Sequence, residues 1–157
     1  MVIMTQMIEF SATSEIAAPA EHVWRIMTDI ARETQWMTAV GSVAFVGDPA
    51  SYKVGARMRR SGKFLWIELS WESEIVVGEP MKQIRFRHSG AIRGESRWEI
   101  EPTSAGCRVR LWSLGPAPGP LKWLPGFAAY GGRLGLKGDL ARLKRLAESA
   151  QANPVPL

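Results

Sequence analysis

The order of the secondary-structure elements is first set by residues 8–36, which read IEFSATSEIAAPAEHVWRIMTDIARETQW. Residues 8–17 alternate loosely, as a β-strand does, and Pro19 suits the first position of a helix, where its missing N–H costs nothing. Asp29 is a suitable N-cap for a second helical turn that ends near Trp36. The apolar residues between these points recur at helical spacing: Val23, Ile26, Met27 and Ile30. The stretch predicts one strand followed by two short helices.

Almost everything between residues 40 and 116 has the character of β-structure. Residues 64–77 show the clearest period of two, with Trp71 and Ser73 on one side and Glu72 and Glu74 on the other. Such alternation indicates a sheet with one dry face and one wet face. We predict that Gly62 and Lys63 form the tight connection before this strand. The six strands expected in this region are residues 40–46, 56–61, 64–77, 83–89, 92–101 and 107–114.

The end of the chain predicts one long helix over residues 127–150, after a proline-rich loop. Its second half has a clear apolar face of Leu136, Leu140, Leu143 and Ala147. Its first half contains four glycines, each of which costs about 1 kcal/mol relative to alanine in a helix. We expect residues 1–150 to form a single domain and residues 151–157 to be a flexible tail. The predicted fold class is α+β, with a seven-stranded curved antiparallel sheet wrapped around the C-terminal helix.

Composition narrows the function without naming it. The 157 residues carry a net charge of +5, but the basic residues are mostly interleaved with glutamate, which favours an ion-paired surface over a nucleic-acid groove. The lone Cys107 forms neither an intramolecular disulfide nor a zinc site, and it fits a reducing compartment. We therefore expect a cytoplasmic protein with no metal, no cofactor, no nucleic-acid partner and no stable membrane insertion. Monomer and homodimer both remain open.

Turn and core residues occur along the chain in a characteristic order: Ala18, Pro19, Val23, Trp24, Asp29, Trp36, Gly55, Glu79, Pro80, Glu101, Pro102, residues 106–109 and residues 143–148. In this order and spacing the chain resembles the START/SRPBCC, or helix-grip, superfamily, and within it the polyketide cyclase/dehydrase-like branch. The resemblance covers residues 10–148. One departure is Cys107, where the family commonly has threonine. The resemblance implies a hydrophobic cavity between the sheet and the long helix, and a lipid, polyketide or aromatic ligand. It transfers no catalytic motif.

Several side chains are candidates for a site in such a cavity. Strand parity places His88 on the inward face, where an imidazole that titrates near neutral pH could act as a general base or simply bond to a neighbour. Arg60 points inward in one register and into solvent in the next. Tyr130 either reaches the cavity mouth or packs on the sheet. The expected ligand-binding residues are Trp71, Ser73, Phe86, His88, Ser96, Trp98, Leu111, Phe127, Tyr130 and Leu134.

Three functional hypotheses follow. The first is binding of a small hydrophobic or aromatic ligand, which a wholly apolar cavity would favour. The second is a cyclase or dehydratase that uses His88 with Arg60 or Tyr130, which an inward polar pair within hydrogen-bond reach would favour. The third is a protein-interaction module that uses the apolar segment 121–127, which an exposed contiguous apolar patch would favour. The seven tryptophans leave it undecided whether the cavity is open or filled.

Overall fold

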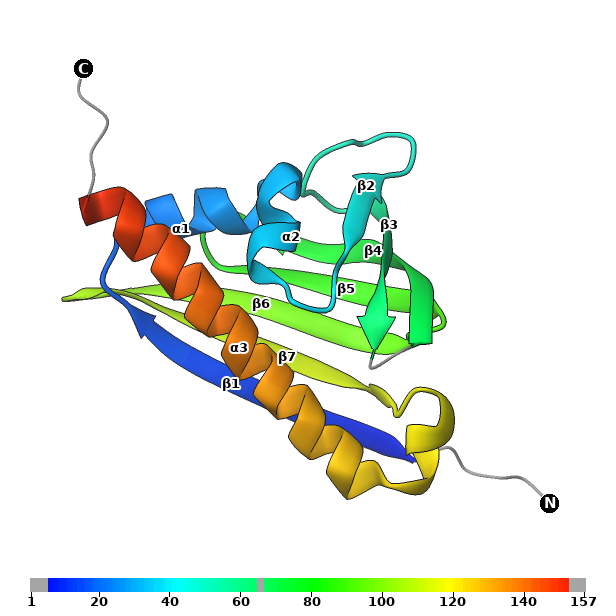
Figure 1. Ribbon diagram of the computed structural model, residues 1–157. Helices are drawn as coiled ribbons and strands as arrows, with labels where there is room; N and C mark the ends of the chain where they lie inside the picture. Colours follow the sequence, from blue (N-terminus) through cyan, green and yellow to red (C-terminus); the bar gives the residue numbers. More distant parts are fainter. Residues whose placement is uncertain (1–5, 65–66, 153–157) are drawn as a thin grey trace.

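A computed structural model describes residues 6–64 and 67–152 (Figure 1). Its seven strands form one antiparallel sheet in the order β1-β7-β6-β5-β4-β3-β2, and the long helix α3 crosses the concave face of that sheet. This arrangement confirms the predicted fold class. The elements are β1 (Met7–Ile16), α1 (Ala20–Met27), η1 (Ile30–Arg32), α2 (Glu33–Trp36), β2 (Ser42–Phe45), β3 (Arg57–Phe64), β4 (Ile67–Glu79), β5 (Gln83–Gly90), β6 (Gly94–Thr103), β7 (Gly106–Pro116), η2 (Gly119–Trp123) and α3 (Pro125–Ala152).

The strand boundaries differ from the predicted ones by a few residues, and one connection differs in kind. Gly62 and Lys63 are not a turn: they belong to β3 and pair with Leu69 and Glu68 of β4. The connection itself, at residues 65–66, lies outside the described residues. Glycine is required at 62 for a different reason, because a Cβ there would collide with the carbonyl oxygen of Ala39. Helix α3 continues to Ala152, two residues past its predicted end, and residues 153–157 lie outside the described chain.

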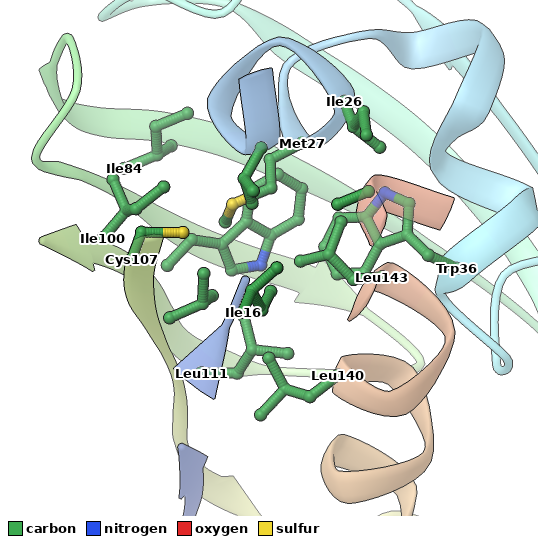
Figure 2. Packing of buried hydrophobic residues seen from close by; sticks show 14 of the residues in the cluster. Ile16, Ile26, Met27, Trp36, Ile84, Ile100, Cys107, Leu111, Leu140 and Leu143 are labelled. Atoms are coloured by element: carbon green, nitrogen blue, oxygen red, sulfur yellow. The ribbon is translucent and has the colours of Figure 1, made fainter. Parts of the chain in front are cut away.

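The hydrophobic core lies between the sheet and the helices at one end of the concave face. Trp36 of α2 is fully buried and packs edge-on against Trp98 of β6, with the ring centroids 5.1 Å apart. Met27 from α1 and Leu143 from α3 complete this packing, and Figure 2 shows their side chains converging with those of the strands. Tryptophan therefore fills this end of the inner face. No helix in the described parts of the chain has the length and hydropathy needed to cross a bilayer.

Helix α3 presents different faces along its length. Leu140, Leu143 and Ala147 are buried against the core, as their spacing predicts. The carboxylate of Asp139 accepts hydrogen bonds from the backbone N–H and the hydroxyl of Thr38, which fixes this side of α3 next to the end of α2. Burial raises the pKa of Asp139, and the two bonds from Thr38 lower it.

The first half of α3 corrects the predicted lining of the cavity. Phe127, Tyr130 and Leu134 are 63%, 62% and 49% exposed, so they point away from the sheet and do not line its inner face. The reason is helical geometry. Successive residues of a helix are rotated by about 100°, so a helix that turns Ala128 toward the core turns Phe127, Tyr130 and Leu134 to other sides. Tyr130 is exposed and lines an open hollow beside β1, together with residues 9–13 and with Arg133 and Lys137 of α3.

The free edge of β1 is bonded to the second half of α3. Because β1 pairs only with β7, its other edge presents unpaired backbone groups. The carboxylate of Glu148 accepts a hydrogen bond from the backbone N–H of Ala17 at 3.0 Å, and Lys144 donates to the carbonyl of Glu15 at 2.8 Å. The last helix thus holds the first strand through two polar contacts.

The glycines of α3 allow a matched test of this packing. A Cβ at position 135 would meet nothing within 4 Å, whereas at position 132 it would lie 2.6 Å from the ring of Phe10. We expect Gly135→Ala to raise the free energy of unfolding by about 0.5–1 kcal/mol, because alanine has the higher helix propensity. Gly132→Ala is expected to lose that gain to the clash. Urea unfolding of the two variants measures the difference, and equal stabilisation by both would contradict the close contact between α3 and β1.

Candidate functional site

Along the strands, the side chains on the inner face of the sheet change from fully buried to partly exposed to solvent. At the end covered by α1 and α2, Ile75, Ile84 and Val109 are fully buried. At the other end, His88, Ser96 and Ser113 share the inward parity but are only half-buried. Ser113 lies near the first half of α3, because Gly132 of α3 lies against Phe10, which pairs with Ser113, and Ser96 of the next strand pairs with Ser113 in turn. The accessible end of the inner face is therefore polar, and it is the candidate site.

His88 stands at the centre of this polar end, with both ring nitrogens hydrogen-bonded. Its Nδ1 lies 2.8 Å from the hydroxyl of Ser73 on β4, and its Nε2 lies 2.7 Å from the hydroxyl of Ser96 on β6. A neutral imidazole has one donor and one acceptor nitrogen, so one serine donates to the ring and the other accepts from it. The three side chains form a directional hydrogen-bonded row across three strands, called here the Ser–His–Ser row.

The surroundings of His88 keep its ring neutral. Burial, reinforced by the nearby positive charge of Arg60, lowers the pKa of His88 from 6.5 to about 3. The ring of Phe86 stacks beside it, with the two ring centroids 6.2 Å apart. A base with so low a pKa accepts a proton poorly at neutral pH, because efficient general bases have pKa values near the working pH. The geometry therefore suits hydrogen bonding better than proton abstraction by the imidazole.

A buried ion pair lies next to the Ser–His–Ser row. Arg60 of β3 donates from Nε and Nη2 to the two carboxylate oxygens of Glu33, each at 2.6 Å, and both side chains are almost fully buried. This bidentate geometry satisfies both charges at once. The guanidinium also lies 5.0 Å from the ring centre of Phe86 and 6.0 Å from that of Trp98. Arg60 thus points inward, which settles the register that the sequence left open.

Tyr52 joins the ion pair from the loop between β2 and β3. Its hydroxyl donates to Glu33 at 3.3 Å. Burial, with the negative charge of Glu33 beside it, raises the pKa of the Tyr52 hydroxyl. The phenol therefore stays protonated and acts as a hydrogen-bond donor. Glu33, Arg60 and Tyr52 connect α2, β3 and the loop that precedes β3 at the border of the candidate site.

Seven of the ten predicted ligand-binding residues lie on the inner face. Trp71, Phe86, Trp98 and Leu111 are buried there, and Ser73, His88 and Ser96 form the hydrogen-bonded row. Phe127, Tyr130 and Leu134 do not join them. The structure adds Glu33, Tyr52 and Ser113, which sequence reasoning missed. Ser113 shares the parity of Val109 and Leu111, so a signal for it existed, whereas nothing in the sequence indicates the partners of Glu33 and Tyr52.

The donor set determines the chemistry that this site offers. In the described residues, no group of three or more His, Cys, Asp or Glu side chains is placed to hold a metal ion. Burial, with the negative charge of Glu15 beside it, raises the pKa of the Cys107 thiol, which makes a poor nucleophile. The available groups are neutral hydroxyls, a neutral imidazole and aromatic faces. Such groups orient an uncharged or weakly polar molecule by hydrogen bonds and stacking.

The ion pair predicts a specific pattern of stability. Glu33→Gln leaves the buried guanidinium of Arg60 without its counter-charge, and we expect a loss of about 3–5 kcal/mol in the free energy of unfolding. Glu33→Gln combined with Arg60→Met removes both charges and is expected to recover part of that loss. Chemical denaturation of the single and double variants measures both values. Losses that simply add would show that the two side chains do not depend on each other.

The neutral state of His88 predicts a dependence on pH. Because the pKa in the folded protein, about 3, lies below the ordinary 6.5, the unfolded chain binds a proton first as the pH falls. The stabilising contribution is thus complete above pH 6.5 and is lost as the pH falls from 6.5 toward 3, by up to about 1.4 kcal/mol per pH unit. His88→Gln should lose less stability between pH 7 and pH 4.5 than the parent protein, measured by urea unfolding. Parallel losses would contradict the neutral imidazole.

Comparisons with known proteins agree on the fold. The 23%-identical protein TTHA0849 of Thermus thermophilus superposes with a TM-score of 0.74, over 90% of this chain and 98% of that one. Ara h 8.0201 is 11% identical and matches 92% of this chain and 99% of its own with a TM-score of 0.68. DynU16, described as a putative protein in the dynemicin biosynthetic locus, is 22% identical, with a TM-score of 0.66 over 90% of this chain and 48% of that one.

A search of curated protein sequences gives no match. A family model does match, and it spans nearly the whole described chain, including every strand and all but the last turn of α3. Residues 7–148 fit it, so the chain belongs to the polyketide cyclase/dehydrase and lipid transport family.

Proposed function

We propose that this protein binds a small hydrophobic or aromatic molecule, lipid-like or polyketide-like, against the accessible end of the inner face beneath the first half of α3. The observation that carries the proposal is the contrast along the inner face, where fully buried aliphatic residues give way to the half-buried His88, Ser96 and Ser113. Inward-facing side chains that still contact solvent indicate accessible space over this end of the sheet. Aromatic walls with a few convergent polar groups are typical of ligand sites.

The glycines of α3 support the presence of this space. Gly135 lies one helical turn before Asp139, on the side of α3 that contacts the end of α2. A Cβ at Gly135 would meet no heavy atom within 4 Å, and Gly135 is exposed, so the helix backbone there borders solvent-accessible space. A glycine in a helix costs stability, and a bare backbone that leaves room for a ligand accounts for glycine at position 135.

The polar groups suggest how a ligand is oriented. Both nitrogens of His88 are bonded to serines, so a ligand oxygen meets the hydroxyl groups of Ser96 or Ser113 before it meets the ring. These hydroxyls donate or accept, and they match a phenol, a ketone or an ester equally well. Glu33 neutralises Arg60, which leaves the border of the site without net charge. An uncharged ligand with one or two oxygen atoms fits this environment.

A cyclase or dehydratase is the second candidate, and the Ser–His–Ser row favours it. An inward polar pair within hydrogen-bond reach is present, because the imidazole of His88 lies within hydrogen-bond distance of the hydroxyls of Ser73 and Ser96. Once a bound compound is identified, mass spectrometry of that compound after incubation distinguishes the two functions. Conversion that His88→Gln abolishes supports the enzyme, and unchanged compound supports binding alone.

Ligand binding is tested with an apolar fluorescent probe, 8-anilinonaphthalene-1-sulfonate, together with native mass spectrometry of freshly purified protein. Gly135→Trp places an indole in the open space next to the helix and is expected to weaken probe binding at least tenfold. Ala141→Trp, on another side of α3 where residue 141 is exposed, is the matched control and should bind as the parent does.

A further variant separates this site from the outer surface of α3. Phe127→Ser removes an exposed aromatic ring and should leave probe affinity unchanged. Absence of probe binding by the parent protein, or equal binding by Gly135→Trp, would contradict the inner-face site. Loss of binding in Phe127→Ser would place the probe on the outer face instead.

A further inference from the structure

One outer face of the protein is unusually apolar. Among the described residues, five of the seven large hydrophobic side chains that are exposed fall between positions 123 and 134. They are Trp123, Leu124, Phe127, Tyr130 and Leu134, called here the apolar ridge. Phe127, Tyr130 and Leu134 follow one another at helical spacing, and Trp123 and Leu124 continue the surface where η2 meets α3. Exposed hydrophobic side chains that occur singly are ordinary, but a contiguous set indicates an interaction site.

The apolar ridge is not needed to hold α3 on the sheet. The first half of the helix is anchored by other residues, since Ala128 is buried in a small cluster with Ile8 and Ala117. Gly126, Gly131 and Gly138 lie among the ridge residues, and a Cβ at any of them would meet nothing within 4 Å. The large side chains therefore project separately from a thin helix. This shape penetrates a deformable surface more readily than it fits the close-packed surface of another protein.

The charged side chains that η2 and the first half of α3 place beside the apolar ridge are basic, and the one acidic side chain in the adjoining hollow, Glu9 of β1, accepts a hydrogen bond from the indole of Trp112. Lys122, Arg133 and Lys137 are exposed beside it, and the ammonium of Lys122 lies 5.3 Å from the ring centre of Trp123. The sequence has no Asp or Glu between Glu101 and Asp139, and Asp139 is buried. A second copy of this chain placed face to face would bring two basic borders together, which opposes self-association. An anionic partner is the complementary one.

We propose that the apolar ridge and its basic border dock this protein on the surface of an anionic lipid bilayer. Tryptophan and tyrosine favour the interfacial region of a bilayer, where an apolar body and a polar tip are both satisfied. Leu124, Phe127 and Leu134 enter the boundary of the acyl chains, while Lys122, Arg133 and Lys137 contact the anionic headgroups. The helix lies on the membrane plane without crossing it. The docked face and the accessible end of the inner face then share the same half of α3.

Vesicle co-sedimentation tests the proposal with the full chain. Phosphatidylcholine vesicles are compared with vesicles that contain about one third phosphatidylserine, and binding is expected only to the latter, with a decrease at high salt. Phe127→Ser combined with Leu134→Ser should abolish binding. Arg133→Gln combined with Lys137→Gln should weaken it roughly thirtyfold, since each basic residue near an anionic surface contributes about fivefold. Arg59→Gln combined with Arg87→Gln removes two exposed charges from the sheet and is the matched control.

The depth to which the apolar ridge enters the bilayer is measured by the quenching of tryptophan emission with phosphatidylserine vesicles that carry brominated acyl chains. Quenching in the parent that is lost in Trp123→Phe supports the proposed orientation. Circular dichroism of each variant confirms that the fold is intact. The proposal is overturned if the parent binds neither vesicle type, or if the charge control weakens binding as much as Arg133→Gln with Lys137→Gln. It is equally overturned if the apolar ridge instead mediates a dimer in the absence of lipid.

Discussion

The bidentate contact between Glu33 and Arg60 is the interaction on which the organisation of the inner face depends. A guanidinium held among Phe86 and Trp98 requires a counter-charge, and Glu33 of α2 provides it. Helix α2 brings Glu33 over β3, and the same short helix inserts Trp36 into the core. The position of α2 is therefore fixed both by charge compensation through Glu33 and by hydrophobic packing through Trp36. The field of Arg60 also contributes to keeping His88 neutral, so the protonation state of the Ser–His–Ser row depends on the same residue.

Much of the sheet could be predicted because alternation is a local property. The parity of Trp71, Ser73 and Ile75 on β4 follows directly from the sequence, and their burial confirms it. Asp29 could be predicted as an N-cap, and its side chain accepts from the backbone N–H of Ala31. The orientation of Arg60 could not be predicted, because a strand rich in Arg, Ser, Gly and Lys has no hydrophobic pattern to fix its register.

Long-range contacts and helix faces explain the remaining differences. Glu33 lies 27 residues from Arg60, and no local pattern distinguishes it from an ordinary surface glutamate. In the first half of α3 the structure differs from the prediction for another reason. Phe127, Tyr130 and Leu134 are apolar and helically spaced, which in most helices indicates a core-facing stripe. They lie on the opposite side of the helix from Leu140 and Leu143. The residue spacing shows that the two apolar sets lie on different faces, but an exposed apolar face is contrary to the usual expectation.

The position of β1 at the edge of the sheet has a consequence for the order in which the protein is assembled. β1 is made first, yet its only strand partner is β7, and its free edge is bonded by Lys144 and Glu148. Strands β2 to β7 form a meander in which each strand pairs with the next one along the chain, so these pairings need no distant segment. β1 has no partner until residue 116 has been synthesised. The nascent chain therefore exposes an unpaired strand for most of its synthesis, and closure of the sheet is a late step that joins the two ends of the described chain.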